Sequence, residues 1–203
     1  MKNAALRWIE RALLAVGLGL GVWCAAVMVE ARIVARMPVP APPSPAAATV
    51  ITPPATGDWV ARLDAPTVRL SATVLEGTGD ATLERGAGHI EDTPFPGQPG
   101  NIGVAGHRDT TFRPVRHLRT GDPLELTTRD GVYRYLITKT FIVDPTDVYV
   151  LDPGEQPMLT LVTCYPFEYI GHAPRRYIIQ AVLVHQAART AAGEAGRAGR
   201  VIF

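Results

Sequence analysis

The chain has 203 residues, a formal net charge of +1, an apolar fraction of 47% and two cysteines. This length is enough for one domain of ordinary size plus an appendage. The nearly even charge excludes the basic field expected of a nucleic-acid-binding protein, so we expect no nucleic acid among the partners.

An uncharged apolar stretch occupies residues 12–29 and follows Lys2, Arg7 and Arg11. As a helix it would rise roughly 27 Å, close to the thickness of a hydrocarbon core. Positive charge before the stretch predicts a cytoplasmic segment 1–11, a transmembrane anchor and an external C-terminal part. The alternatives are a cleaved signal peptide, for which residues 25–27 are a loose cleavage pattern, and a buried helix of a soluble protein.

A proline- and alanine-rich segment follows at residues 30–57, with all of its prolines after Met37. Proline at this density blocks helices and sheet ladders and favours the extended polyproline II conformation. We therefore predict a linker without a packed core, which holds the next part of the chain away from the membrane.

Residues 58–186 show an all-β pattern. Residues 67–74 alternate polar and apolar side chains, and Asp130 and Gly131 precede a long β-rich run, which is typical of a hairpin. Two segments, around residues 82–85 and 112–118, favour short helical turns. Many short strands with Gly/Pro turns imply a closed barrel or a sandwich. The predicted strands are residues 68–74, 101–105, 124–126, 132–143, 158–163 and 177–184.

The last segment, residues 187–203, is rich in Ala, Gly and Arg and lacks apolar periodicity, so we predict a flexible tail.

The two cysteines lie in different environments, Cys24 in the apolar stretch and Cys164 in the β-rich part. If the first is in lipid and the second outside the cell, they cannot pair, and Cys164 is a free thiol. A β run ends at Cys164, and Pro166 stops any ladder two residues later. This pattern predicts a thiol where a loop opens, although a buried cysteine that acts as a small hydrophobe is the alternative.

His107 also follows a short predicted strand, and Gly106 removes side-chain bulk beside it. A histidine placed near a thiol can take its proton or stabilise the thiolate, whereas the alternative is a histidine that braces a loop. Asp109 is a candidate to orient a nearby group.

Arg175 and Arg176 precede the last predicted strand. A guanidinium near a thiolate and a scissile carbonyl can stabilise an oxyanion or hold a substrate backbone, although most arginines are solvated surface residues. Adjacent strand residues point to opposite faces, so only one of the two can readily face the thiol.

Together these segments resemble the sortase family, most closely class D. The resemblance rests on Thr-Leu-Val-Thr-Cys at 160–164, on Arg176 twelve positions later, and on Gly-His-Arg-Asp-Thr at 106–110. Residues 86–101 also look like the region before the sortase histidine. The likeness covers roughly residues 59–184.

The resemblance implies an all-β, closed eight-stranded barrel with short helices, preceded by one transmembrane helix. It implies catalytic roles for Cys164, His107 and Arg176, and we add Thr163, Arg175 and Asp109 as candidate binding residues. His89 fits the family pattern as a structural residue.

The implied reaction is cleavage of an LPXTG-like sorting signal of a secreted protein through a thioester, followed by transfer to an amine of a peptidoglycan precursor or another protein. The alternatives are a cysteine endopeptidase that hydrolyses the same thioester and a non-catalytic surface β-domain. We expect no cofactor. No CxxC or HxxxH spacing indicates zinc, and Glu91, Asp92 and Asp109 form no recognisable calcium loop.

Overall fold

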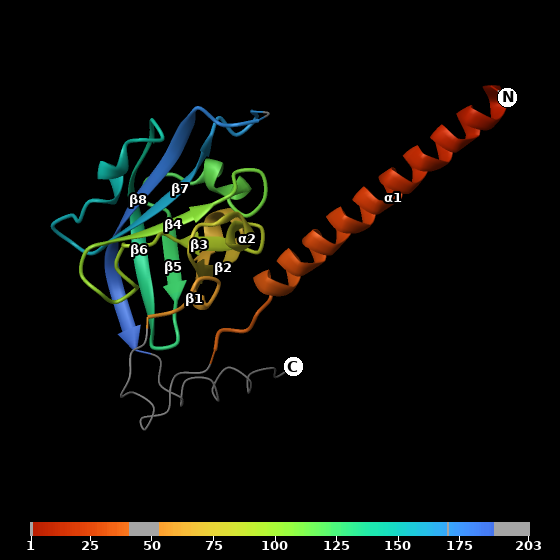
Figure 1. The fold of residues 1–203 in the computed structure, drawn as a ribbon. Coiled ribbons are helices and arrows are strands. Elements are labelled where there is room, and N and C mark those ends of the chain that lie inside the picture. Colours follow the sequence, from red (N-terminus) through yellow and green to blue (C-terminus); the bar gives the residue numbers. More distant parts are fainter. Residues whose placement is uncertain (1, 41–52, 170, 189–203) are drawn as a thin grey trace, which may run out of the picture.

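The structure is a computed structural model that describes residues 2–40, 53–169 and 171–188. Helix α1 (Lys2–Ala35) leads into a β-barrel and projects away from it (Figure 1). The helix exceeds the predicted anchor at both ends and includes residues 30–35, which we had expected in the linker. The physical reason is that helix formers continue through Glu30 and Arg32, and the first proline comes at position 38. Residues 41–52 of the predicted linker and 189–203 of the predicted tail lie outside the described residues.

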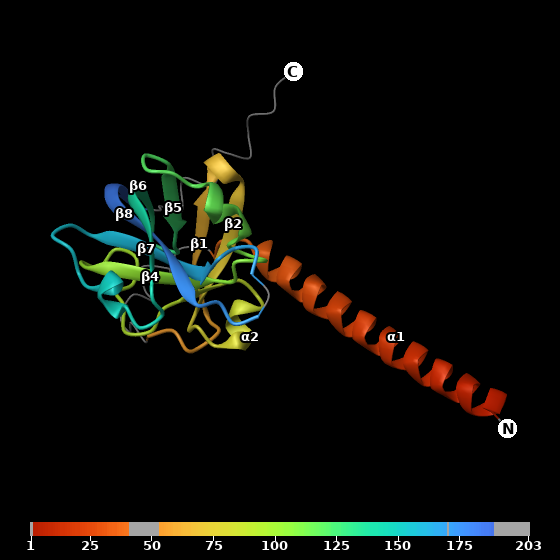
Figure 2. The same cartoon turned by 90° about the horizontal axis from the view of Figure 1, so that it is seen from above.

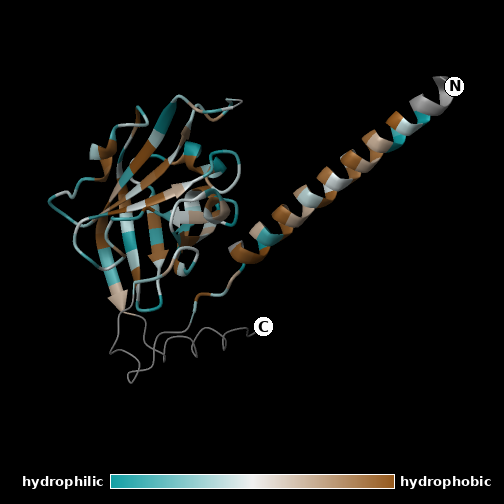
Figure 3. Cartoon of the chain, in the orientation of Figure 1, coloured by the Kyte–Doolittle hydropathy of each residue, from teal (hydrophilic) through white to brown (hydrophobic). Residues whose placement is uncertain are grey.

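Helix α1 fits a single-pass anchor. Its segment Arg7–Val34 is long and apolar enough to cross a membrane. Large apolar side chains such as Leu13 and Trp23 are exposed, and apolar residues cover most of the helix (Figure 3). A helix that is apolar on most sides and unpacked is typical of a membrane segment.

The C-terminal end of α1 packs against the barrel. Val34 is buried, and its carbonyl accepts a hydrogen bond of 2.6 Å from Thr73 Oγ1 on strand β2. Glu30 forms an ion pair with Arg85 at 3.3 Å. In both views the helix leaves the barrel beside β2 and α2 (Figure 2). The junction between helix and barrel is therefore a packed contact.

The barrel closes in the order β1-β2-β3-β4-β7-β8-β6-β5, with β5 paired to β1. This confirms the predicted closed eight-stranded barrel. The pairs β2–β3 and β4–β7 are parallel and the other pairs are antiparallel. The strands are β1 (Trp59–Ala65), β2 (Leu70–Glu76), β3 (Ala87–His89), β4 (Asn101–Gly106), β5 (Pro123–Thr127), β6 (Gly131–Val143), β7 (Met158–Tyr165) and β8 (Arg175–Ala188).

Short helices lie between the strands, and two of them match the predicted helical turns. They are η2 (Pro66–Val68), α2 (Asp80–Leu83), η3 (Arg113–His117) and η4 (Val148–Leu151). The predicted hairpin at Asp130 and Gly131 joins β5 and β6, which pair antiparallel.

Two groups of apolar side chains form the core. The larger fills the barrel interior and includes Leu63, Leu126 and Leu161. The smaller lies on the outer face of β6, β7 and β8, because strand side chains alternate between the two faces. Its members are Val143, Val150 and Ile178, with Phe141, Leu151 and Val162 packed against them. Helix η4 covers this outer group and thereby shapes the face on which the candidate site lies.

Candidate active site

Strands β7 and β8 place a thiol opposite a guanidinium. Cys164 on β7 pairs with Arg176 on β8, and Tyr165 pairs with Arg175. Directly opposite residues of an antiparallel pair point to the same face. Arg176 therefore shares a face with Cys164, whereas Arg175 points to the other face. Cys164 is a free, partly exposed thiol.

Strand β4 brings His107 to the level of Cys164 along the neighbouring strand β7. Gly106 at the end of β4 lies beside Thr163 of β7 in a parallel register. His107 follows Gly106, and Cys164 follows Thr163, so the imidazole and thiol belong to neighbouring positions on adjacent strands. His107 is partly exposed. The registers thus bring His107, Cys164 and Arg176 to neighbouring positions of three strands, β4, β7 and β8, which follow one another in the barrel.

Gly106 is required by a close approach of Phe112. A Cβ at position 106 would lie 2.6 Å from Cγ of the Phe112 ring, which is fully buried. The backbone N–H of Phe112 donates to the carbonyl of His107 at 2.8 Å and closes the turn. The turn after β4 therefore folds back so that Phe112 packs against Gly106, directly before His107. A side chain at position 106 would push the Phe112 ring and strand β4 apart.

Thr163 connects β7 to β4 on the opposite face from Cys164. Its hydroxyl donates to the Gly106 carbonyl at 2.6 Å, and the side chain is buried. The Thr163 side chain is therefore directed away from the thiol, and its contact supports the strand that carries His107.

The other two predicted binding residues, Arg175 and Asp109, are exposed. The Arg175 side chain is exposed, with Nε 3.9 Å from Asp144 Oδ1. Asp109 is exposed in the turn after His107, where the described part of the chain offers it no hydrogen bond or ion pair. The resemblance favoured Arg176 over Arg175 by its motif position, and the register of β7 and β8 gives a geometric reason for the same choice.

Two arginines that the sequence reasoning missed hold the segment between β7 and β8. Arg108 Nη2 donates to the carbonyls of Tyr169 and Gly171, the latter at 3.1 Å. Arg116 of η3 forms an ion pair with Glu168. The position of Arg108, directly after His107, was the available signal. These contacts connect the turn after β4 to the segment after Cys164.

Arg176 has donors left for a ligand. Its Nη1 lies 3.1 Å from the carbonyl of Arg175 and 3.4 Å from that of Ala173. A guanidinium has five N–H donors, and the remaining ones of Arg176 find no partner among the described residues. A thiol, an imidazole and a guanidinium with unused N–H donors lie on one face. They can supply a nucleophile, a proton acceptor and an oxyanion stabiliser.

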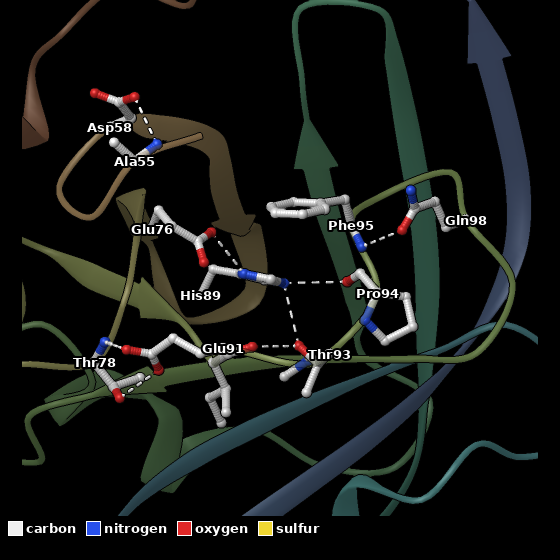
Figure 4. Close-up of polar contacts among 12 residues, drawn as sticks. Ala55, Asp58, Glu76, Thr78, His89, Glu91, Thr93, Pro94, Phe95 and Gln98 are labelled. Carbon is white, nitrogen blue, oxygen red and sulfur yellow. Dashed lines mark hydrogen bonds and ion pairs between the residues drawn. The ribbon is translucent and has the colours of Figure 1, made fainter. Parts of the chain in front are cut away.

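His89 lies in a separate buried network (Figure 4). Its Nδ1 is 2.8 Å from Glu76 Oε2, and its Nε2 is 3.1 Å from Thr93 Oγ1 and 3.2 Å from the Pro94 carbonyl. The ring stacks on Phe95 at 4.5 Å between centroids. These contacts attach the segment after β3 to the barrel, which fits the structural role expected for His89.

No group of three or more His, Cys, Asp or Glu side chains suited to a metal occurs in residues 2–40, 53–169 and 171–188. The carboxylate of Glu91 accepts hydrogen bonds from Thr78 instead (Figure 4).

Comparisons with known proteins agree with this geometry. The family model described as a sortase domain matches residues 63–184. Sortase D of Bacillus subtilis (strain 168) is 42% identical over 127 residues, which are 62% of this chain and 64% of that protein. The chain thus spans somewhat less than two thirds of that relative.

Solved structures give the same result. A Clostridium perfringens Sortase D5 transpeptidase aligns with a TM-score of 0.59 and 31% identity, over 65% of this chain and 82% of that one. The catalytic domain of B. anthracis SrtD aligns with a TM-score of 0.59 and 37% identity, over 70% of this chain and 99% of that one. Since the family model matches more than half of the residues and the barrel is shared, the chain belongs to the sortase family.

Proposed function

We propose that this chain is a membrane-anchored sortase of the cysteine transpeptidase type. The observation that carries the proposal is the register of β4, β7 and β8, which aligns His107, Cys164 and Arg176 on one face. The similarity to sortases of class D, one of them described as a transpeptidase, supports the same reaction.

In the proposed first half-reaction, the Cys164 thiolate attacks the Thr carbonyl of an LPXTG-like sorting signal. Arg176 donates hydrogen bonds to the oxyanion of the tetrahedral intermediate. The C–N bond breaks, His107 gives a proton to the departing amine, and the acyl group remains on Cys164 as a thioester.

In the second half-reaction, an amine of the cell envelope attacks the thioester. His107 accepts the proton of that amine, the C–S bond breaks, and Cys164 leaves as a thiolate. The product is a new amide between the secreted protein and a peptidoglycan precursor or another protein. Helix α1 would hold this domain on the external side of the membrane, since Lys2, Arg7 and Arg11 precede the span.

The full chain, in detergent micelles, tests this proposal with a pentapeptide library of the LPXTG type. Intact-mass measurement is expected to detect an acyl adduct on wild type that is absent from Cys164→Ala. Cleavage is expected to fall by about 10³-fold or more in Cys164→Ala and His107→Gln. Cleavage that survives in Cys164→Ala would contradict the proposal.

Triglycine separates transfer from hydrolysis. A ligated product that increases with triglycine concentration supports a transpeptidase, whereas hydrolysed peptide alone indicates the cysteine endopeptidase. If alkylation of Cys164 changes nothing and no adduct forms, the domain is a non-catalytic surface module.

A further inference from the structure

The last turns of α1 present one side of the helix to the barrel. Val27 and Ala31 are partly buried and Val34 is buried, whereas Val29 is exposed. Residues at positions i, i+4 and i+7 share one side of a helix. Val27 lies inside the apolar stretch 12–29, so the contact with the barrel begins before the predicted span ends.

Helix α2 and strands β1 and β2 form the other side of this contact. Residues of α1 and of the segment that contains α2 line a cavity of about 140 Å³: Val27, Glu30, Ala81, Glu84 and Arg85. Farther along α1, Thr73 Oγ1 donates to the Val34 carbonyl, and Arg62 Nη2 donates to the Met37 carbonyl. These contacts at successive levels of the helix hold its end in one direction relative to the barrel.

The direction of α1 decides which side of the barrel faces the bilayer that the helix would cross. Residues 166–169 and 171–174, which we call the β7–β8 connection, lie on the side toward which α1 points (Figure 1 and Figure 2). The teal turn η4 lies on the opposite side in both views. From Val29 to Val34 the helix rises roughly 8 Å, about the depth of one headgroup layer. A membrane-spanning α1 therefore holds the β7–β8 connection against the headgroups.

The β7–β8 connection carries side chains that suit a bilayer interface. Tyr169 is 45% exposed, and the guanidinium carbon of Arg108 lies 5.9 Å from the centroid of its ring. Glu168, the one acidic residue in the sequence of this connection, forms an ion pair with Arg116. Tyrosine is enriched where a bilayer meets water, because its ring is apolar and its hydroxyl is polar. Arginines beside such a ring can bind lipid phosphates.

We propose that the β7–β8 connection is a membrane-contact surface, whose partner is the headgroup layer of the bilayer that α1 crosses. The ring of Tyr169 lies in this layer. The inference rests on the part of the proposed function that places α1 across the membrane, and it adds a second contact with the lipid. Because Tyr169 follows Cys164 by five residues, this contact also sets the distance between the thiol and the bilayer.

Fluorescence quenching of the full chain in a bilayer tests the proposal. The chain carries Cys24→Ala and Cys164→Ala, and one nitrobenzoxadiazole label is attached through either Tyr169→Cys or Tyr149→Cys. Tyr149 of η4 is the matched control, because it is also an exposed tyrosine, at 58%, but lies on the side away from α1. The bilayer is a nanodisc of phosphatidylcholine and phosphatidylglycerol, with or without a lipid that carries a nitroxide on its headgroup.

We expect the nitroxide lipid to quench the label at position 169 at least about threefold more strongly than the label at position 149, because only the former lies in the headgroup layer. Thr73→Val with Arg85→Ala removes two contacts between α1 and the barrel. In this background we expect quenching at position 169 to fall at least about twofold, since the helix then no longer fixes the direction of the barrel.

Equal quenching at positions 169 and 149, in chains that enter the nanodisc, shows that the inference alone is wrong. Unchanged quenching at position 169 after Thr73→Val with Arg85→Ala also overturns it, because the contact then does not depend on the docked helix. A chain that does not enter the nanodisc refutes the anchor and this inference with it. Since the labels are read in Cys164→Ala, failure of the proposed reaction in wild type is a separate result.

Discussion

Gly106 lets the buried ring of Phe112 approach strand β4 closely at the residue directly before His107. In Gly106→Ala the new Cβ would lie within 2.9 Å of three Phe112 ring carbons, so the ring or strand β4 must move. We expect a loss of about 1–3 kcal/mol in the free energy of unfolding, measured by denaturant titration, and a larger proportional loss of kcat/KM because His107 moves with the strand.

Gly79→Ala is the control for this substitution. A Cβ at Gly79 meets nothing within 4 Å and its φ is −64°, so its free energy of unfolding should stay within about 0.5 kcal/mol of wild type. Equal stability of Gly106→Ala and Gly79→Ala would contradict the packing argument.

Arg175 and Arg176 are adjacent in sequence but lie on opposite faces of β8. Arg176→Ala is expected to lower kcat about 100-fold, since removing one oxyanion donor typically costs this much. Arg175→Ala is expected to cost less than about threefold, because its side chain is exposed and its contact to Asp144 is long. Steady-state kinetics on the same peptide compares them, and a larger loss in Arg175→Ala would transfer the oxyanion role to Arg175.

The segment between β3 and β4 has an acid-sensitive contact at Glu91. Its pKa lies below the ordinary value because its own backbone N–H and Thr78 donate hydrogen bonds to the carboxylate, against a smaller desolvation effect. A carboxylate with a lowered folded-state pKa stabilises the fold above its unfolded pKa, and this stabilisation disappears as pH falls through the folded pKa.

Glu91→Gln should therefore have a lower Tm than wild type at pH 7, and the difference should shrink as pH falls from about 5 toward 3. Thermal unfolding across this range measures the effect. Glu155→Gln is the control, because Glu155 is exposed and makes no ion pair in the described ranges. A Tm difference that grows toward low pH would contradict the assignment.

The positions of the two cysteines allow a test of which side of the membrane the barrel lies on. Cys24 lies on α1 and Cys164 on the barrel, and both are free thiols. If the barrel is external, a membrane-impermeant maleimide applied to intact cells should label Cys164 and leave Cys24 unlabelled in lipid. Labelling should disappear in Cys164→Ser. Labelling of Cys164 only after the cells are opened would reverse the proposed orientation.

The contact of α1 with β2 changes the expected relation of anchor and barrel. The proline-rich segment predicted a spacer, yet Glu30 and Val34 lie beyond the predicted span and contact the barrel directly. The proline-rich part, which begins at Pro38, therefore comes after the contact between helix and barrel and does not separate the two. Propensity along the chain indicates where a helix can continue, but the docking of its end depends on Thr73 and Arg85, which are distant in sequence.

Local sequence was sufficient for the long apolar helix, the all-β class and most strands, because hydropathy and alternation are properties of neighbouring residues. Local sequence patterns did not indicate β1, β3 or η4. Alanines occupy two of the three buried positions of β1, β3 has only three residues, and η4 is a single short turn.

The residue types of the candidate site were also visible in the sequence, since Cys164, His107 and the two arginines follow or precede strand patterns. Their arrangement depends on barrel closure. The parallel register of β4 with β7 and the antiparallel register of β7 with β8 place the three groups on one face and direct Arg175 and Thr163 away. Gly106 and Thr163, which β4 and β7 bring together, are 57 positions apart, and the register of β7 with β8 is set across the loop between them. Neither register can be deduced from the pattern of one strand alone.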